Sequence, residues 1–101
     1  MGLKIEKNLT GTAASVTLGG RLDTGTAPEL EKELEPLLPE AQTLRLDLAG
    51  LEYISSAGLR VLLKTQKAMS QKGGMTLCHV PEGVREVFDI TGFADFLSIE
   101  N

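Results

Sequence analysis

The period of the hydrophobic positions changes between residues 44 and 63, and this change gives the clearest prediction of local structure in the chain. Leucines alternate with polar residues over residues 44–48, as they do in a strand with one buried face. From Leu59 onward the apolar residues recur every three or four positions, as on one face of a helix. Two adjacent serines, Ser55 and Ser56, stand between the two patterns. The sequence therefore predicts a strand, a turn that carries both serines, and an amphipathic helix.

Alternation also predicts two strands in the N-terminal part of the chain, over residues 3–7 and 14–18. Residues 8–12 have the composition of a turn, so we expect the two strands to form a hairpin. The glycine pair at 19–20 is expected to end the second strand, and residues 21–23 to form a short separate piece.

A helix is expected to follow this piece. Thr26 and Glu29 have the spacing of a capping box, and Thr24 is an alternative N-cap. Leucines then recur at helical spacing as far as residue 38. A proline in a helix interior removes a backbone donor, so we expect the helix to kink or tighten at Pro36 and to end before Pro39.

The C-terminal half repeats the alternation of strand and helix. Gly73 is expected at the C′ position of the second helix. The nearly continuous apolar run 75–80 predicts a central strand that is covered on both faces. A last helix with apolar positions over residues 84–90 is expected to end at Gly92, and the apolar residues in 93–99 to form a closing segment or a short edge strand.

The predicted order is β-β-α-β-α-β-α-β, and a strand that follows a helix in this way pairs in parallel with the strand before it. We therefore expect an α/β fold with a small mixed β-sheet of four to five strands and three to four helices mainly on one face. The length of 101 residues suits a single domain that spans residues 1–101.

Composition narrows the functional classes. With 42% apolar residues the chain can bury a core, and its net charge of −4 argues against binding to nucleic acid or to anionic lipid. Cys78 is the only cysteine, so the chain can form no internal disulfide, and we do not expect a metal cluster. The charged start and the lack of any long apolar run predict a cytoplasmic protein with no membrane insertion. We expect no cofactor and no metal.

The two serines admit two interpretations. One serine at this place is a good N-cap, worth about 1 kcal/mol. A serine beside the unpaired N–H groups of a helix start is also a place where a phosphate is tolerated. Ala57 and Gly58 are small, so a partner protein would be able to approach the hydroxyl groups closely.

Enzymatic chemistry is not predicted. His79 is the only histidine and neighbours Cys78 in an apolar segment, so we expect both to pack in the interior. Asp47 lies on the polar side of its strand and is expected to be solvated or paired. Ser56 therefore has no positioned base that would make it a nucleophile, and no phosphate-binding loop of the nucleotide hydrolases is present.

Four segments of the chain resemble the STAS domain of the bacterial anti-sigma factor antagonists. They are Gly20-Arg21-Leu22-Asp23 leading into Thr26-Ala27-Pro28-Glu29-Leu30, Leu44-Arg45-Leu46-Asp47-Leu48 leading into Leu51-Glu52-Tyr53-Ile54-Ser55-Ser56-Ala57-Gly58-Leu59, Lys72-Gly73-Gly74-Met75-Thr76-Leu77, and Val84-Arg85-Glu86-Val87-Phe88 with Thr91-Gly92-Phe93. The serine segment is the most specific of the four, and together they span nearly the whole chain.

The resemblance implies a mechanism. Such a protein binds an anti-sigma factor that is also a serine kinase, and so frees the sigma factor. The kinase then phosphorylates the residue two places before the motif glycine, here Ser56, and a serine phosphatase resets it. The family often has aspartate directly before the acceptor, where this chain has Ser55, so Ser55 is the alternative acceptor.

The same resemblance implies a partner-binding surface around the serines. Its expected members are Asp23, Thr24, Tyr53, Ile54, Ser55, Ser56, Ala57, Gly58, Leu59 and Arg60. The alternative function is that of a STAS subunit in a membrane transport complex for lipids or anions, with an ATPase or a permease as the partner.

Overall fold

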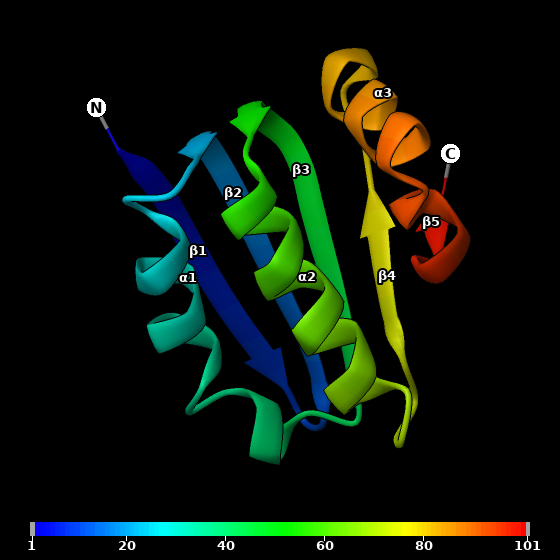
Figure 1. The fold of residues 1–101 in the computed structure, drawn as a ribbon. Helices are drawn as coiled ribbons and strands as arrows, with labels where there is room; N and C mark the ends of the chain where they lie inside the picture. The colour runs from blue at the N-terminus through cyan, green and yellow to red at the C-terminus, as the bar shows by residue number, and fades with distance from the viewer. Residues whose placement is uncertain (1, 101) are drawn as a thin grey trace.

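The structure is a computed structural model and describes residues 2–100. Over these residues the chain forms one five-stranded sheet, three α-helices and two short 3-10 helices (Figure 1). In chain order the elements are β1 (Leu3–Thr10), β2 (Ala13–Leu22), α1 (Ala27–Leu34), η1 (Leu38–Glu40), β3 (Thr43–Ile54), α2 (Ser56–Met69), β4 (Met75–Cys78), α3 (Glu82–Thr91), η2 (Phe93–Phe96) and β5 (Ile99–Glu100).

The strands lie in the sheet in the order in which they occur in the chain, β1-β2-β3-β4-β5. β1 is antiparallel to β2, and every later pair is parallel. A parallel pair needs a crossover, and α1, α2 and α3 supply the three crossovers. Right-handed crossovers that always step in the same direction place their helices on one face of the sheet, and Figure 1 shows α1 and α2 crossing that face. The predicted mixed sheet with helices on one face is confirmed.

The first hairpin is longer than the sequence pattern predicted. Asn8 and Thr10 belong to β1, where they pair with Ser15 and Ala13, so the predicted turn over residues 8–12 is wrong in its extent. Only two residues separate the strands, and Gly11 takes the left-handed conformation that so tight a turn requires, with φ of 63°.

β2 and β3 also run further than expected. β2 continues through its two glycines, because Gly19 pairs with Gly50 of β3 and Gly20 pairs with Leu51. The predicted break at the glycine pair is therefore wrong. Two facing glycines let the backbones approach closely: a Cβ atom built on Gly50 would lie 3.3 Å from the Cα atom of Gly19. The long parallel pairing carries β2 and β3 together up to the serine turn.

α1 begins after Thr26, its N-cap residue, and ends before Pro39, as predicted, but the hydrogen bonds at its start differ from the prediction. The Thr26 side chain makes no capping bond to the helix, since its hydroxyl accepts a hydrogen bond from the Asp23 N–H at 2.8 Å and donates to the Arg21 carbonyl at 2.8 Å. The capping box is therefore wrong. α1 already ends at Leu34, so Pro36 lies beyond it and causes no kink, and Pro39 lies inside the separate 3-10 helix η1.

The end of α2 is closed by a different glycine from the one predicted. Gly74, with φ of 97°, donates its N–H to the Met69 carbonyl at 3.0 Å. Gly73 instead packs closely against the backbone of Gln42: a Cβ atom on Gly73 would lie 2.6 Å from the Gln42 carbonyl oxygen. Its predicted C′ role is wrong, although the site still requires glycine.

β4 is shorter than the predicted strand over residues 75–80. It ends at Cys78, because His79 has a left-handed backbone with φ of 54°. The helices cover one face of the sheet, and on the other face Thr76 is half-buried whereas Cys78 is buried, so the expected cover on both faces is confirmed only for part of the strand. The predicted closing edge strand is confirmed as β5, which pairs with β4.

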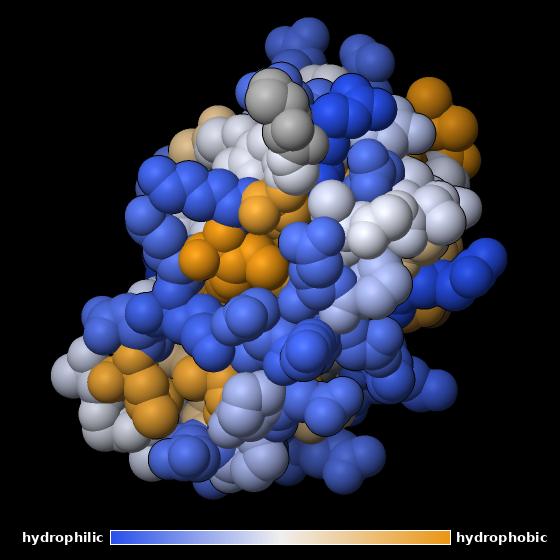
Figure 2. Space-filling model, turned by 90° about the vertical axis from the view of Figure 1, so that its left-hand side faces the viewer, coloured by the Kyte–Doolittle hydropathy of each residue, from blue (hydrophilic) through white to orange (hydrophobic). Residues whose placement is uncertain are grey.

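The core lies between the helices and the face of the sheet that they cover. Its fully buried side chains are mostly leucines, with Phe88 of α3 as the largest. Viewed from the β1 and α1 side, the surface is mainly hydrophilic, with small and separate hydrophobic patches (Figure 2). In residues 2–100 no helix has the length and apolar content needed to cross a bilayer.

Gly58 allows the first turn of α2 to pack tightly on the sheet. A Cβ atom at this position would lie 2.6 Å from Leu22 Cγ and 3.0 Å from both Ile54 Cγ1 and the Leu22 carbonyl oxygen. Two of these three atoms belong to β2 and one to the end of β3, so the contact fixes the distance between the start of α2 and both strands.

We predict that Gly58→Ala destabilises the protein by about 1–3 kcal/mol, because overpacking outweighs the gain in helix propensity. Gly83→Ala in the first turn of α3 is the matched control: nothing lies within 4 Å of its added Cβ atom, so it should be neutral or slightly stabilising. Chemical denaturation measures both variants. Equal stability of the two would contradict the proposed contact.

Candidate functional site

The serine turn begins where β3 ends. Ser55 has an extended backbone and is the N-cap of α2, and its Oγ accepts a hydrogen bond from the Gly58 N–H at 3.3 Å. Its own N–H donates to the Leu22 carbonyl at 2.9 Å, which ties the turn to the end of β2. The N-cap interpretation is thus confirmed for Ser55, whose hydroxyl has a structural role.

Ser56 has a different environment. It is the first residue of α2 and is exposed, and no hydrogen bond to its hydroxyl is found within residues 2–100. The first N–H groups of a helix have no acceptor inside the helix, and the aligned peptide dipoles make this end positive. The geometry leaves the Ser56 hydroxyl accessible and surrounds it with groups that stabilise an added negative charge.

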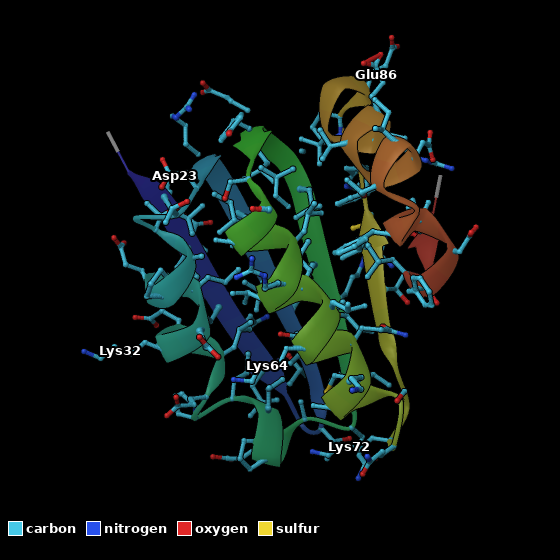
Figure 3. The ribbon with its side chains drawn as sticks, viewed as in Figure 1. Asp23, Lys32, Lys64, Lys72 and Glu86 are labelled. Atoms are coloured by element: carbon cyan, nitrogen blue, oxygen red, sulfur yellow. The ribbon has the colours of Figure 1, made fainter. Side chains whose placement is uncertain are left out.

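The loop after β2 lies beside the serine turn because Leu22 pairs in register with Ile54. Asp23 organises this loop: its Oδ1 accepts hydrogen bonds from the N–H groups of Gly25 and Thr26, both at 3.0 Å. The hydrogen bond from the Thr26 backbone is the main cause that lowers the pKa of Asp23. Figure 3 shows Asp23 at the same end of the molecule as the start of α2.

Arg21 also belongs to this region, although the hydrophobic pattern of the sequence does not indicate it. It pairs in register with Tyr53, and its guanidinium lies 4.3 Å from the centre of the Tyr53 ring, within the range of a cation–π interaction. Its Nε also lies 3.8 Å from Asp23 Oδ2. Only the pairing of β2 with β3 reveals that Arg21 lies opposite Tyr53, so the sequence alone could not identify Arg21 as a member of this region.

A groove of about 300 Å³ runs between α1 and α2 and reaches the serine turn at Ala57. Lys64 of α2 extends across the groove and forms an ion pair with Glu31 of α1 (Figure 3). The groove is lined by Thr24, Ala27, Pro28, Glu31, Ala57, Arg60, Val61 and Lys64. The groove therefore extends the accessible surface around Ser56 along α1 and α2.

The ten predicted partner-binding residues divide by burial. Ile54, Gly58 and Leu59 are buried and support the surface from below. Gly58 faces Leu22, so the expectation that it lowers the outer surface is wrong. We use the term serine-turn surface for the members that remain accessible: Asp23, Thr24, Tyr53, Ser55, Ser56, Ala57 and Arg60.

His79 and Asp47 lie elsewhere, on the face of the sheet that carries no helices. The His79 side chain is 62% exposed, so its predicted packing in the interior is wrong. Its Nδ1 lies 3.2 Å from Asp47 Oδ1, which confirms that Asp47 is paired. Asp47 Oδ1 also accepts a hydrogen bond from the Ala49 N–H at 3.0 Å, the main cause that lowers the pKa of Asp47.

We predict different effects for alanine at the two serines. Ser55→Ala removes the side-chain cap and should lower the free energy of unfolding by about 1 kcal/mol. Ser56→Ala removes an exposed hydroxyl and should change it by less than about 0.5 kcal/mol. Urea denaturation of both variants measures this difference. A larger loss for Ser56→Ala would show that the cap is misassigned.

Asp23 should make stability depend on pH in acidic solution. Its carboxyl pKa is lowered in the folded protein from the ordinary value of 3.8, so it contributes stability above that value, and this is lost as the pH falls through the folded pKa. The stability difference between the unmodified protein and Asp23→Asn should therefore stay constant above about pH 5 and shrink as the pH falls below about 4 and through the folded pKa. Denaturation curves across this range provide the test, and a constant difference would contradict the assignment.

Comparison with known proteins places the chain in a family. The sequence model of the family described as "Mlab, STAS domain" matches residues 5–99. The anti-sigma-B factor antagonist of Staphylococcus epidermidis is 35% identical over 101 residues, which cover 98% of this chain and 94% of that protein. The anti-sigma-B factor antagonist of Bacillus subtilis (strain 168) is 31% identical over 100 residues, which cover 98% of this chain and 92% of that protein.

Solved structures share the fold. An anti-sigma factor antagonist from Mycobacterium paratuberculosis matches with a TM-score of 0.87 and 21% identity, over 97% of this chain and 85% of that chain. The Bacillus cell fate determinant SpoIIAA in its phosphorylated form matches with a TM-score of 0.73 and 16% identity, over 99% of this chain and 92% of that chain. The names of these relatives describe regulatory proteins and not enzymes. The chain belongs to the STAS-domain family of anti-sigma factor antagonists.

Proposed function

We propose that this protein is an anti-sigma factor antagonist that is switched by phosphorylation of Ser56. In the unphosphorylated state the serine-turn surface binds an anti-sigma factor that is also a serine kinase, and the sigma factor is released. Phosphorylation ends this binding, and a serine phosphatase restores it, all in the cytoplasm. The observation that carries the proposal is the exposed Ser56 hydroxyl at the start of α2, free of hydrogen bonds within residues 2–100.

The geometry favours Ser56 over Ser55 as the acceptor. The Ser55 hydroxyl accepts the capping hydrogen bond from the Gly58 N–H and is half-buried. A phosphate on Ser55 would have to replace that bond within the turn. Ser56 is exposed, so a kinase can reach its hydroxyl without disturbing the cap.

A phosphate on Ser56 would change the surface more than the fold. It adds a charge of about −1.5 to −2 beside the positive end of α2, which stabilises it locally. Arg60 is four residues further along the same helix, so its guanidinium is within reach of the phosphate. The phosphate would thus add negative charge next to Asp23 and also engage an arginine that the partner would otherwise contact.

The test is phosphorylation by the cognate kinase with ATP, followed by mapping of the phosphate by mass spectrometry. We expect one phosphate on Ser56, which Ser56→Ala abolishes. Ser55→Ala is the matched control and should still be phosphorylated on Ser56. A phosphate on Ser55 alone would transfer the switch to that residue, and no phosphate on either serine would refute the switch.

Binding of the kinase should follow the charge at residue 56. Ser56→Ala should bind at least as tightly as the unmodified protein, and Ser56→Asp should bind at least about tenfold more weakly, which corresponds to about 1.4 kcal/mol. Titration of each variant with the kinase measures both affinities. Equal affinities would mean that charge at this position does not control binding.

The alternative function is that of a STAS subunit in a membrane transport complex, which shares the STAS domain matched over residues 5–99. Purification from the native cell would distinguish the two functions. A partner ATPase or permease would support the transport complex, and a serine kinase would support the switch.

A further inference from the structure

The face of the sheet without helices carries a cluster of three metal-binding side chains. Asp47 of β3 and Cys78 of β4 are direct partners in the parallel register, so their side chains lie side by side on this face. The Cys78 thiol is free of any disulfide and buried. A thiol and a carboxylate are therefore held next to each other by two neighbouring strands.

The backbone of His79 brings a third donor to the same place. Successive residues of a strand point to opposite faces, so a regular β4 would direct His79 away from Cys78. The left-handed conformation of His79, with φ of 54°, ends the strand and turns the imidazole back over Asp47. The resulting distance from His79 Nδ1 to Asp47 Oδ1 is 3.2 Å.

These three donors have the composition and spacing of a metal site. One donor atom each from Asp47, Cys78 and His79 all lie within 4.8 Å of one another. Two donors bound to one tetrahedral Zn²⁺ ion are about 3.3–3.6 Å apart, as follows from Zn–N and Zn–S bonds of about 2.1 and 2.3 Å. The imidazole and the carboxylate, at 3.2 Å, are within about 0.1 Å of this range, and small side-chain rotations would bring all three donors to it.

The charges around the cluster are compatible with a cation. Arg45 neighbours Cys78, and its charge is balanced by Glu100, whose carboxylate accepts two hydrogen bonds from the guanidinium at 3.2 and 2.6 Å. The Asp47 carboxylate contributes a negative charge, and Cys78 contributes a second one when it binds as a thiolate and releases its proton to solvent.

We propose that Asp47, Cys78 and His79 form a binding site for a divalent transition metal ion, with Zn²⁺ best suited to this set of sulfur, nitrogen and oxygen donors. The site lies across the sheet from α2, so it is independent of the switch proposed for Ser56. An ion there would bridge the ends of the β3–β4 pair and stabilise the short strand β4.

The test uses Co²⁺, which reports sulfur ligation by absorption, with the untagged chain. Cys78 and His79 are the only cysteine and the only histidine, so no second thiol or imidazole competes. We expect one equivalent of Co²⁺ to produce a thiolate-to-cobalt charge-transfer band in the near ultraviolet, which Zn²⁺ then abolishes by displacement. Zn²⁺ should also raise the melting temperature.

Variants distinguish a metal site formed by three residues from coordination by the Cys78 thiolate alone. Cys78→Ser should abolish the band, and Asp47→Asn and His79→Gly should each weaken Co²⁺ binding at least about tenfold. His79→Gly keeps the fold testable, because glycine readily adopts the left-handed backbone. Asp89→Asn on α3 is the control carboxylate and should bind as the unmodified chain does.

Two outcomes would overturn the proposal. One is the absence of a charge-transfer band at stoichiometric Co²⁺. The other is unchanged affinity in both His79→Gly and Asp47→Asn, which would reduce the cluster to a single coordinating thiol.

Discussion

The parallel pairing of β2 with β3 is the constraint on which the rest of the structure depends. It continues to the last residues of both strands, where Leu22 pairs with Ile54, and one further hydrogen bond joins the Ser55 N–H to the Leu22 carbonyl. This pairing places the Asp23 loop and the serine turn side by side although more than 30 residues separate them in the chain. Without it, Ser55 would cap a helix whose position relative to Asp23 is not defined.

The same pairing explains why small residues occur where they do. Gly19 and Gly50 face each other between β2 and β3, and Gly58 lets the first turn of α2 rest directly on Leu22. Because glycine has no side chain, each of these positions allows a closer contact than another residue would. The accessible hydroxyl of Ser56 thus lies on a turn that is held from below by tight packing, which suits the proposed switch, in which the surface would change its charge and keep its shape.

The sequence predicted the kind and order of the elements better than their ends. The leucine alternation and the helical spacing after Leu59 were enough for the mixed sheet with helices on one face, because hydrophobic periodicity reflects burial directly. The break expected at Gly19 and Gly20 was wrong because pairing with β3 overrides the weak strand propensity of glycine. The two serines could be found from the sequence, whereas the roles of Thr26 and Arg21 depend on contacts across the β2–α1 loop and between strands.

His79 is another residue whose environment could not be predicted from the sequence. Its neighbours are apolar, which suggested burial, but a single left-handed residue moved it onto the exposed face beside Asp47. A backbone angle of this kind leaves no periodic signal in the sequence, so the grouping of Asp47, Cys78 and His79 could not be predicted from it.

The sequential strand order has a consequence for how the protein is made. Every strand after β1 pairs with the strand just before it in the chain. When such a strand leaves the ribosome, one of its partners is therefore already synthesised. Pairing between chain neighbours lowers the contact order and shortens the time for which unpaired edges are exposed to other chains.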